Sequence, residues 1–206
     1  MSNIFNKHYK KYDSWYDKHK FAFLSELSAI KKAIPSSGRG LEIGVGTGRF
    51  ASALGISTGI DISEKMLAIA QRRGVSVRRG CGEKIPFPDS SFGYVAIIIT
   101  LCFVKDAKTV LKESARVLKK KGKIIIGIID KMSFLGKAYQ SKKSIFYKHA
   151  KFFSVKKAAG LLKETGFRQL RYYQTISVLP GEMRKLEKPR KGFGRGGFVV
   201  ISAMKR

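Results

Sequence analysis

The chain has 206 residues and carries 42 lysines and arginines against 14 aspartates and glutamates, a formal net charge of +28. Hydrophobic residues make up 44% and aromatic residues 11%, which is enough apolar surface for a core and excludes a disordered chain. The longest apolar stretch, 94–104, is shorter than the ~20 residues that span a bilayer, and the first 20 residues lack the apolar core of a signal peptide. Because two cysteines can form neither a disulfide framework nor a metal knuckle, we expect a soluble, cytoplasmic protein without a bound metal.

Apolar periodicity predicts the secondary structure in chain order. Residues 1–36 indicate an N-terminal helical segment, in which a helix over 21–34 is ended by Pro35. Short apolar runs then alternate with helical patterns, and the helices are expected over 49–54, 63–74, 106–122 and 154–166. The expected strands cover 41–44, 57–61, 75–78, 94–99, 123–129, 168–174 and 198–203.

This alternation predicts an α/β fold with a Rossmann-like, doubly wound, seven-stranded sheet and helices on both faces. The sheet is expected to be mostly parallel with an antiparallel last strand, because no helix separates the last two strands. We interpret 1–206 as one domain, in which 38–130 form a ligand-binding core and 153–206 a helix and a strand pair. Residues 131–152 follow the fifth strand directly. They are placed to cap a site at the carboxyl ends of the strands.

A glycine-rich turn follows the first predicted strand, with the sequence LEIGVGTG at 41–48. Such a turn lets the backbone approach a ligand closely and points helix N–H groups at it. Arg49 stands where a dinucleotide fingerprint needs its third glycine, and no Gly-Lys-Ser/Thr of a P-loop follows. The alternative is an ordinary glycine-rich turn between a strand and a helix.

An acidic residue ends the second predicted strand. Asp61 lies nineteen residues after Glu42, and a carboxylate in that place can accept hydrogen bonds from both hydroxyls of a ribose. The alternative is an acid at a helix N-terminus, just ahead of the capping residue Ser63.

These elements, together with GCGEKIPFPDSSF at 80–92 and ESARVLK at 113–119, resemble the class I S-adenosylmethionine-dependent methyltransferases. The similarity is greatest to the small-molecule subgroup that includes quinone-biosynthesis enzymes, and it covers roughly residues 40–130. YDSWYD at 12–17 is also similar to the segment that precedes the fold in that subgroup. The resemblance implies S-adenosylmethionine (SAM) as cofactor, so the cap predicted at 131–152 would cover the acceptor site.

The resemblance also implies which residues hold SAM. The implied contacts are Glu42, Gly44, Gly46 and Gly48 around the methionine part, Asp61 at the ribose, Ile62 and Met66 near the adenine, Gly82 and Glu83 through their backbone, and Thr100 beside the transferred methyl. Two positions depart from the family pattern, because Cys81 and Gly93 stand where the family commonly has aspartate. The first departure removes a side-chain contact to the adenine amino group, and the second is mainly structural.

Methyl transfer requires a nucleophile in line with the methyl group and the exclusion of water. Aromatic faces favour a positive sulfonium, which makes Tyr12 and Tyr16 candidates, although both could instead anchor the N-terminal helix. A general base is needed only for an acceptor that carries a proton. His149 is the best placed candidate, with a solvated surface histidine as the alternative. Cys102 lacks the preceding proline of a cytosine-C5 nucleophile and is interpreted as a core residue.

Three functions are consistent with these residues. The first is methyl transfer to a small-molecule acceptor by in-line displacement. The absence of Asn/Asp-Pro-Pro-Tyr/Phe after the fourth strand disfavours methylation of base amines. The second is methylation of RNA or an RNA-associated protein through basic clusters, which lie at 72–73, 78–79, 119–123, 142–143 and 184–195. The third is SAM binding without catalysis. The sequence does not indicate an oligomeric state.

Overall fold

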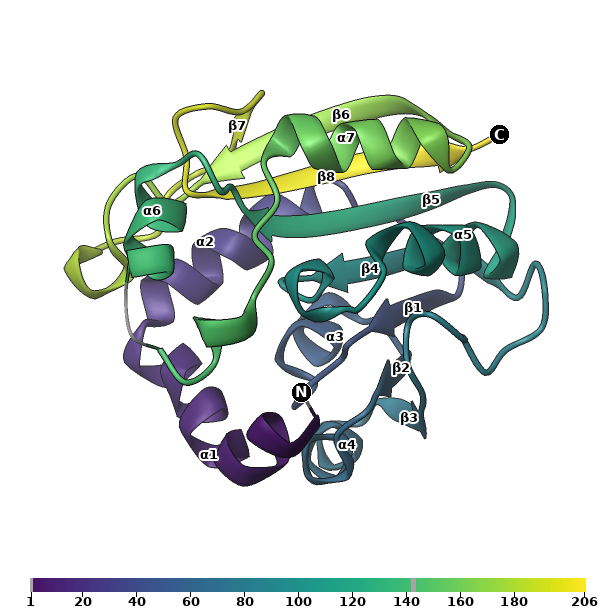
Figure 1. Cartoon of the computed structure of the whole chain (residues 1–206), viewed down its shortest axis with the longest axis horizontal. Coiled ribbons are helices and arrows are strands. Elements are labelled where there is room, and N and C mark those ends of the chain that lie inside the picture. The colour runs from purple at the N-terminus through teal and green to yellow at the C-terminus, as the bar shows by residue number, and fades with distance from the viewer. Residues whose placement is uncertain (1, 142–143) are drawn as a thin grey trace.

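The structure is a computed structural model that describes residues 2–141 and 144–206. Within these residues, eight strands form one sheet in the order β3-β2-β1-β4-β5-β8-β6-β7, and helices cover both of its faces (Figure 1). The strands are β1 Gly40–Ile43, β2 Thr58–Asp61, β3 Ser76–Arg79, β4 Phe92–Ile98, β5 Leu118–Ile129, β6 Phe167–Thr175, β7 Arg190–Lys191 and β8 Phe198–Lys205. No helix in the described part of the chain is both long and apolar enough to cross a membrane.

The sheet confirms the predicted doubly wound architecture. The neighbours from β3 to β5 pair in parallel, whereas β8 runs antiparallel to β5 on one side and to β6 on the other. The strand count of seven was wrong by one, because β7 pairs its two residues with the end of β6. Arg190 and Lys191 are exposed and basic at the sheet edge, so no apolar alternation marks them in the sequence.

The helices are α1 Ser2–Lys18, α2 Lys20–Lys31, α3 Arg49–Leu54, α4 Glu64–Arg72, α5 Ala107–Val117, α6 Phe134–Ser141 and α7 Val155–Glu164, with short 3₁₀ turns η1 Leu101–Phe103, η2 Tyr147–His149 and η3 Pro180–Glu182. The residues at which three of the helices were predicted to begin are their N-caps. Ser63, Asp106 and Ser154 each accept a hydrogen bond from a backbone N–H in the first turn of α4, α5 and α7. The helix α1 is kinked at His8, where φ is −117° and ψ is 23°.

One predicted boundary was wrong. We expected Gly122 to end the helix that Asp106 begins, but α5 ends at Val117 and Gly122 lies inside β5. The backbone of Leu118 is already extended, and this residue pairs with Phe92 of β4. The exposed lysines 119–121 conceal the start of the strand, because they give it no apolar pattern.

Two apolar layers lie on the two faces of the sheet. One contains Ile98, Phe198 and buried residues of α2 such as Ile30, and the other contains Phe92 and Leu111. The carboxyl ends of the parallel strands point toward α1, α2 and α6, which lie at that end of the molecule (Figure 1). This arrangement places the N-terminal segment and the region after β5 over the end of the sheet where ligands bind in such folds.

Candidate active site

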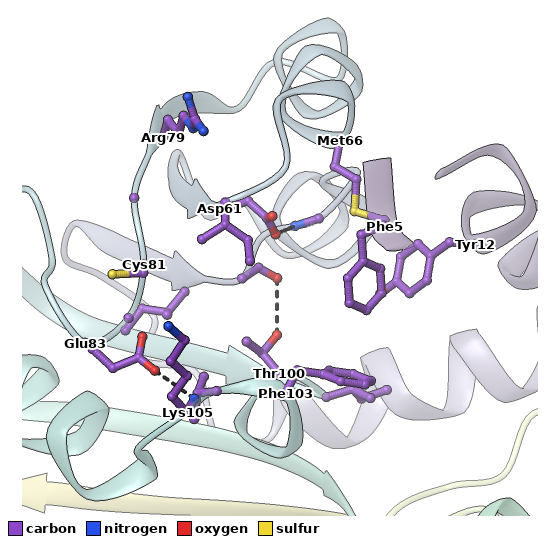
Figure 2. A pocket seen from close by; sticks show the side chains of 18 residues that line it. Phe5, Tyr12, Asp61, Met66, Arg79, Cys81, Glu83, Thr100, Phe103 and Lys105 are labelled. Carbon is purple, nitrogen blue, oxygen red and sulfur yellow. Dashed lines mark hydrogen bonds between the residues drawn. The ribbon is translucent and has the colours of Figure 1, made fainter. Parts of the chain in front are cut away.

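A cavity of about 690 Å³ opens at the carboxyl ends of β1, β2 and β4 (Figure 2). This volume falls in the ~300–1,000 Å³ range of small-molecule sites. Nine of the residues predicted to bind the cofactor line it: Tyr12, Gly44, Gly46, Asp61, Ile62, Met66, Gly82, Glu83 and Thr100. The fold therefore brings most of the predicted cofactor residues into one cavity.

The glycine loop between β1 and α3 forms one wall. Gly44 and Gly46 have positive φ values of 70° and 53°, a backbone conformation that glycine adopts without strain. A Cβ atom on Gly44 would collide with the side chain of Thr100, whose hydroxyl donates a hydrogen bond of 3.3 Å to the Gly44 carbonyl. Gly48 lies outside the cavity lining, where its Cα packs closely on Ala70 of α4. The loop is thus held close to the end of β4 on one side and to α4 on the other.

Asp61 ties the end of β2 to this loop. Its Oδ2 accepts a hydrogen bond of 2.9 Å from the Gly46 N–H (Figure 2). Its Oδ1 accepts a hydrogen bond of 2.8 Å from the Ser63 N–H. Burial raises the pKa of Asp61, and the backbone hydrogen bonds only partly offset this effect. The carboxylate is therefore fixed in orientation at the cavity wall, where its free lone pairs can accept hydrogen bonds from a ligand.

Glu42 lies in β1 and does not line the cavity. Its side chain is buried, and among the described residues its Oε2 has no hydrogen-bond partner. Burial raises the pKa of Glu42 well above its ordinary value, and the nearby charge of Asp61 adds to the shift. A buried acceptor without a donor is costly, so this carboxyl fits a site whose donor arrives with a ligand.

The N-terminal helix α1 closes the cavity. Asp13 accepts hydrogen bonds from Thr47 of the glycine loop, from Arg49 of α3 and from Arg73 after α4, at 2.6 to 2.9 Å. About two helical turns earlier, Asn6 accepts a hydrogen bond of 2.6 Å from the Ser63 hydroxyl. These contacts dock α1 so that the rings of its inner face point into the cavity.

Two of the aromatic rings in the cavity were not predicted. Phe5 and Phe103 line it together with Tyr12, and Phe5 contacts both other rings at 5.3 to 5.8 Å between centroids (Figure 2). Phe5 and Tyr12 are seven residues apart, a spacing that places them on one face of a helix, and this spacing was the available signal. Phe103 lies in η1, whose sequence shows no such pattern.

The other wall comes from the segment after β3. Arg79, Gly80 and Cys81 line the cavity with Lys105, whose backbone N–H donates a hydrogen bond of 2.9 Å to Glu83 (Figure 2). Glu83 thus joins this segment to the turn after β4 through its side chain. The second departure from the family pattern, Gly93, lies within β4 and away from the cavity lining.

The two candidate catalytic residues lie elsewhere. Tyr16 is buried in the core beside Phe50, and its hydroxyl is 2.8 Å from that of Tyr12. His149 lies in η2 and lines a separate, open groove with Lys7 and His8. Their catalytic roles remain predictions. Burial raises the pKa of the Cys102 thiol to about 12, so this side chain stays protonated at neutral pH.

Comparison with known proteins identifies the class. Residues 41–126 match the family described as a methyltransferase domain. The chain is similar to a protein of Thermotoga maritima whose crystal structure is described as a SAM-dependent methyltransferase, possible histamine N-methyltransferase. The two structures align over 100% of both chains, with 45% sequence identity and a TM-score of 0.97. The chain belongs to the class I SAM-dependent methyltransferases, and SAM is its cofactor.

Two further relatives define its neighbourhood in sequence. An uncharacterized protein of Methanocaldococcus jannaschii is 48% identical over 205 residues, which are 98% of this chain and 99% of that protein. A demethylmenaquinone methyltransferase of Bacillus licheniformis is 32% identical over 142 residues, which are 61% of this chain and 60% of that protein. The second similarity agrees with the quinone-biosynthesis-like relation indicated by the sequence motifs.

The cavity fits SAM on its own chemistry. Asp61 places carboxylate oxygens at the cavity wall, and acceptors of this kind match the hydroxyl donors of a ribose. Glu42 is an acceptor without a donor among the described residues, and it directly precedes the loop expected to hold the cofactor's amino group. A Cβ atom on Gly46 would come within 3.7 Å of both Met66 and Tyr12, in the space that the ligand needs. Within the described residues, no group of three histidines, cysteines or acids could hold a metal ion.

Proposed function

We propose that this methyltransferase acts in the cytoplasm on a small-molecule acceptor. SAM supplies a methyl group on a positively charged sulfur, which is displaced in line by a nucleophile. The chain's own residues would hold the cofactor, shield it from water and position the acceptor. The residues after β5, 131–152, are proposed as the cap of the acceptor site.

The observation that carries the proposal is the covering of the cavity by α1. Phe5 and Tyr12 stand over it, and Asp13 fastens the helix to three separate elements. A covered, aromatic-walled cavity suits a small acceptor, whereas a macromolecular acceptor needs an open approach. The names of two relatives, possible histamine N-methyltransferase and demethylmenaquinone methyltransferase, describe small acceptors of those proteins and support the same class here.

Within this proposal, Asp61 orients the ribose and the loop at Gly44 and Gly46 holds the methionine part, with Glu42 accepting from the amino group. Thr100 lies beside the methyl, and Tyr12 faces the sulfonium. We assign no base to the reaction, because His149 lines the separate groove.

Of the basic clusters in the described residues, only the one at 78–79 contributes to the cavity lining, through Arg79. Lysines 119–121 lie at the start of β5, at the end of the sheet opposite the cavity, and Arg190 and Lys191 lie in β7 at the sheet edge. Lys142 and Lys143 lie outside the described residues. This dispersal supports a solvated basic coat over an RNA-binding face.

The test is transfer of radiolabelled methyl from SAM. The purified enzyme is incubated with two fractions of a cell extract, one of metabolites that pass a small-pore filter and one of total RNA with its bound proteins. We expect label in the metabolite fraction alone. Label in the RNA fraction that is lost on nuclease treatment would contradict the proposal.

A further inference from the structure

A second buried acid lies outside the cofactor machinery. Glu26 of α2 is only 3% exposed, and among the described residues its Oε2 has no hydrogen-bond partner. Burial raises the pKa of Glu26 to about 8, and no positive charge among residues 2–141 and 144–206 opposes this shift. The chain has 42 lysines and arginines, so the isolation of this acid is not due to a shortage of cations. A buried acceptor without a donor destabilises the fold and requires an explanation.

Four tyrosines belong to, or pack against, the apolar cluster that contains Leu27 and Ile30, the buried neighbours of Glu26 on α2. Burial raises the pKa of Tyr12, Tyr16, Tyr139 and Tyr147, and the charge of Glu26 raises each of them further. These side chains come from α1, α6 and η2, three elements that meet beside α2 at the carboxyl end of the sheet. Tyr139 and Tyr147 stack at 4.8 Å between centroids, and Tyr12 and Tyr16 meet edge-on at 5.5 Å.

Two aromatic contacts connect this cluster with the cofactor cavity. Tyr12 belongs to both, because it lines the cavity and its hydroxyl is 2.8 Å from that of Tyr16. Phe103 lines the cavity and stacks on Tyr147 at 6.1 Å. The cluster therefore lies directly behind the aromatic wall of the cavity. It involves α6 and η2, both within the proposed cap.

The chemistry of the cluster selects its ligand. Burial keeps this carboxyl protonated near neutral pH, and its ionised form needs a positively charged donor to offset the burial. Aromatic faces around it also favour a positive charge. Metal coordination is not supported, because no group of three metal-binding side chains occurs in the described residues. A protonated amine satisfies both the carboxylate and the rings.

We infer that Glu26 and these four tyrosines form the acceptor subsite, and that it anchors a small molecule through a primary or secondary amine. The inference rests on the proposed function and names the acceptor class. Rotation of Tyr12 and Tyr16, or displacement of α1, would admit the amine from the cofactor cavity.

The first test is binding by the full chain saturated with S-adenosylhomocysteine. A panel of small amines, including histamine, 2-phenylethylamine, tyramine and putrescine, is compared by calorimetry with alcohols of the same carbon skeletons. We expect at least one amine to bind, its alcohol to bind at least tenfold more weakly, and Glu26→Gln to weaken the amine at least tenfold. The affinity for S-adenosylhomocysteine should stay unchanged, since Glu26 does not line the cofactor cavity.

The second test needs no ligand. Because the folded-state pKa of Glu26 is raised from 4.5 to about 8, the wild type should lose stability as the pH rises through this interval. The melting temperature should therefore fall more between pH 6 and pH 9 in the wild type than in Glu26→Gln. The four tyrosines, with pKa values raised above 10, stay neutral over this range. Glu113→Gln is the matched control, because Glu113 accepts hydrogen bonds from Arg116 and Ile85 and its loss should lower the melting temperature.

The outcomes separate cleanly. The inference is overturned if no amine binds, or if the amines that bind do so equally well to Glu26→Gln. It is also overturned if Glu26→Gln loses as much stability as Glu113→Gln, which would show that Glu26 has a structural partner. If the wild type fails to bind S-adenosylhomocysteine, the proposed function fails together with the inference.

Discussion

The docking of α1 through Asp13 provides the sharpest test of how the cavity is closed. Oδ1 of Asp13 accepts hydrogen bonds from Thr47, Arg49 and Arg73, and Oδ2 accepts from both arginines as well. Burial alone would raise the pKa of Asp13, but these hydrogen bonds outweigh it and hold the pKa well below its ordinary value. Asp13→Asn keeps the shape of the side chain, removes its charge and turns a donor toward the two guanidinium groups.

The structure sets the size of the effect. Hydrogen bonds to charged groups contribute ~1.5–3 kcal/mol each to stability. The loss on substitution is smaller than the sum over all these bonds, because the Asp13 side chain is 18% exposed and the amide oxygen of asparagine can still accept some of them. We expect Asp13→Asn to lower the free energy of unfolding by about 2–3 kcal/mol. The contribution of Asp13 is present above pH 3.8 and is lost as the pH falls below that value, because the folded-state pKa is depressed.

Two measurements check this prediction. Urea denaturation at pH 7 gives the change in stability, and hydrogen exchange shows whether the amides of α1 open more readily. Asp17→Asn is the control, because the Asp17 side chain is 64% exposed and, among the residues that the structure describes, pairs with Arg49 alone. Such an exposed ion pair contributes ~0.2–1 kcal/mol. If Asp13→Asn costs no more than Asp17→Asn and leaves exchange in α1 unchanged, the helix is held by its apolar contacts and the reasoning fails.

Two other substitutions test the cofactor site by calorimetry. Asp61→Ala should weaken SAM binding at least tenfold, since it removes the carboxylate that we propose for the ribose and leaves the Gly46 N–H without its acceptor. An unchanged dissociation constant would remove Asp61 from the site. Gly46→Val should abolish SAM binding, because the valine side chain would occupy the cavity next to Met66 and Tyr12. The backbone φ of 53° at this position also disfavours a side chain, so circular dichroism must show that the variant is folded. Tight binding by the folded variant would mean that the loop does not hold the cofactor.

The sequence predicts those parts of the site in which chemistry dictates both the residue and its place. Gly44 and Gly46 are needed for a positive φ, and Asp61 is fixed by the end of a strand, so spacing along the chain is sufficient to find them. The caps Ser63 and Asp106 follow from local rules in the same way. These features depend on neighbours within a few residues.

The parts that the sequence did not predict depend on contacts between distant segments. Glu26 looks like any polar residue of a surface helix, but it is buried in the structure, where α1 and β6 pack against α2. Phe103 lies in the cavity wall because it belongs to the 3₁₀ turn η1, and the sequence of this turn shows no apolar periodicity. Arg190 and Lys191 form a strand only because the end of β6 is available to pair with them. Burial and pairing of this kind arise from tertiary structure, which short-range patterns do not encode.

The kink of α1 at His8 divides the helix into two parts with different anchorage. The later part is held by Asp13 and by the buried ring of Tyr16, whereas the first turns reach the body through Asn6 and the ring of Phe5. β8 ends beside the start of β5, at the end of the sheet far from the cavity (Figure 1). An affinity tag or dye joined to the N-terminus would therefore sit where ligands enter and leave, while the same label at the C-terminus would leave that entrance clear.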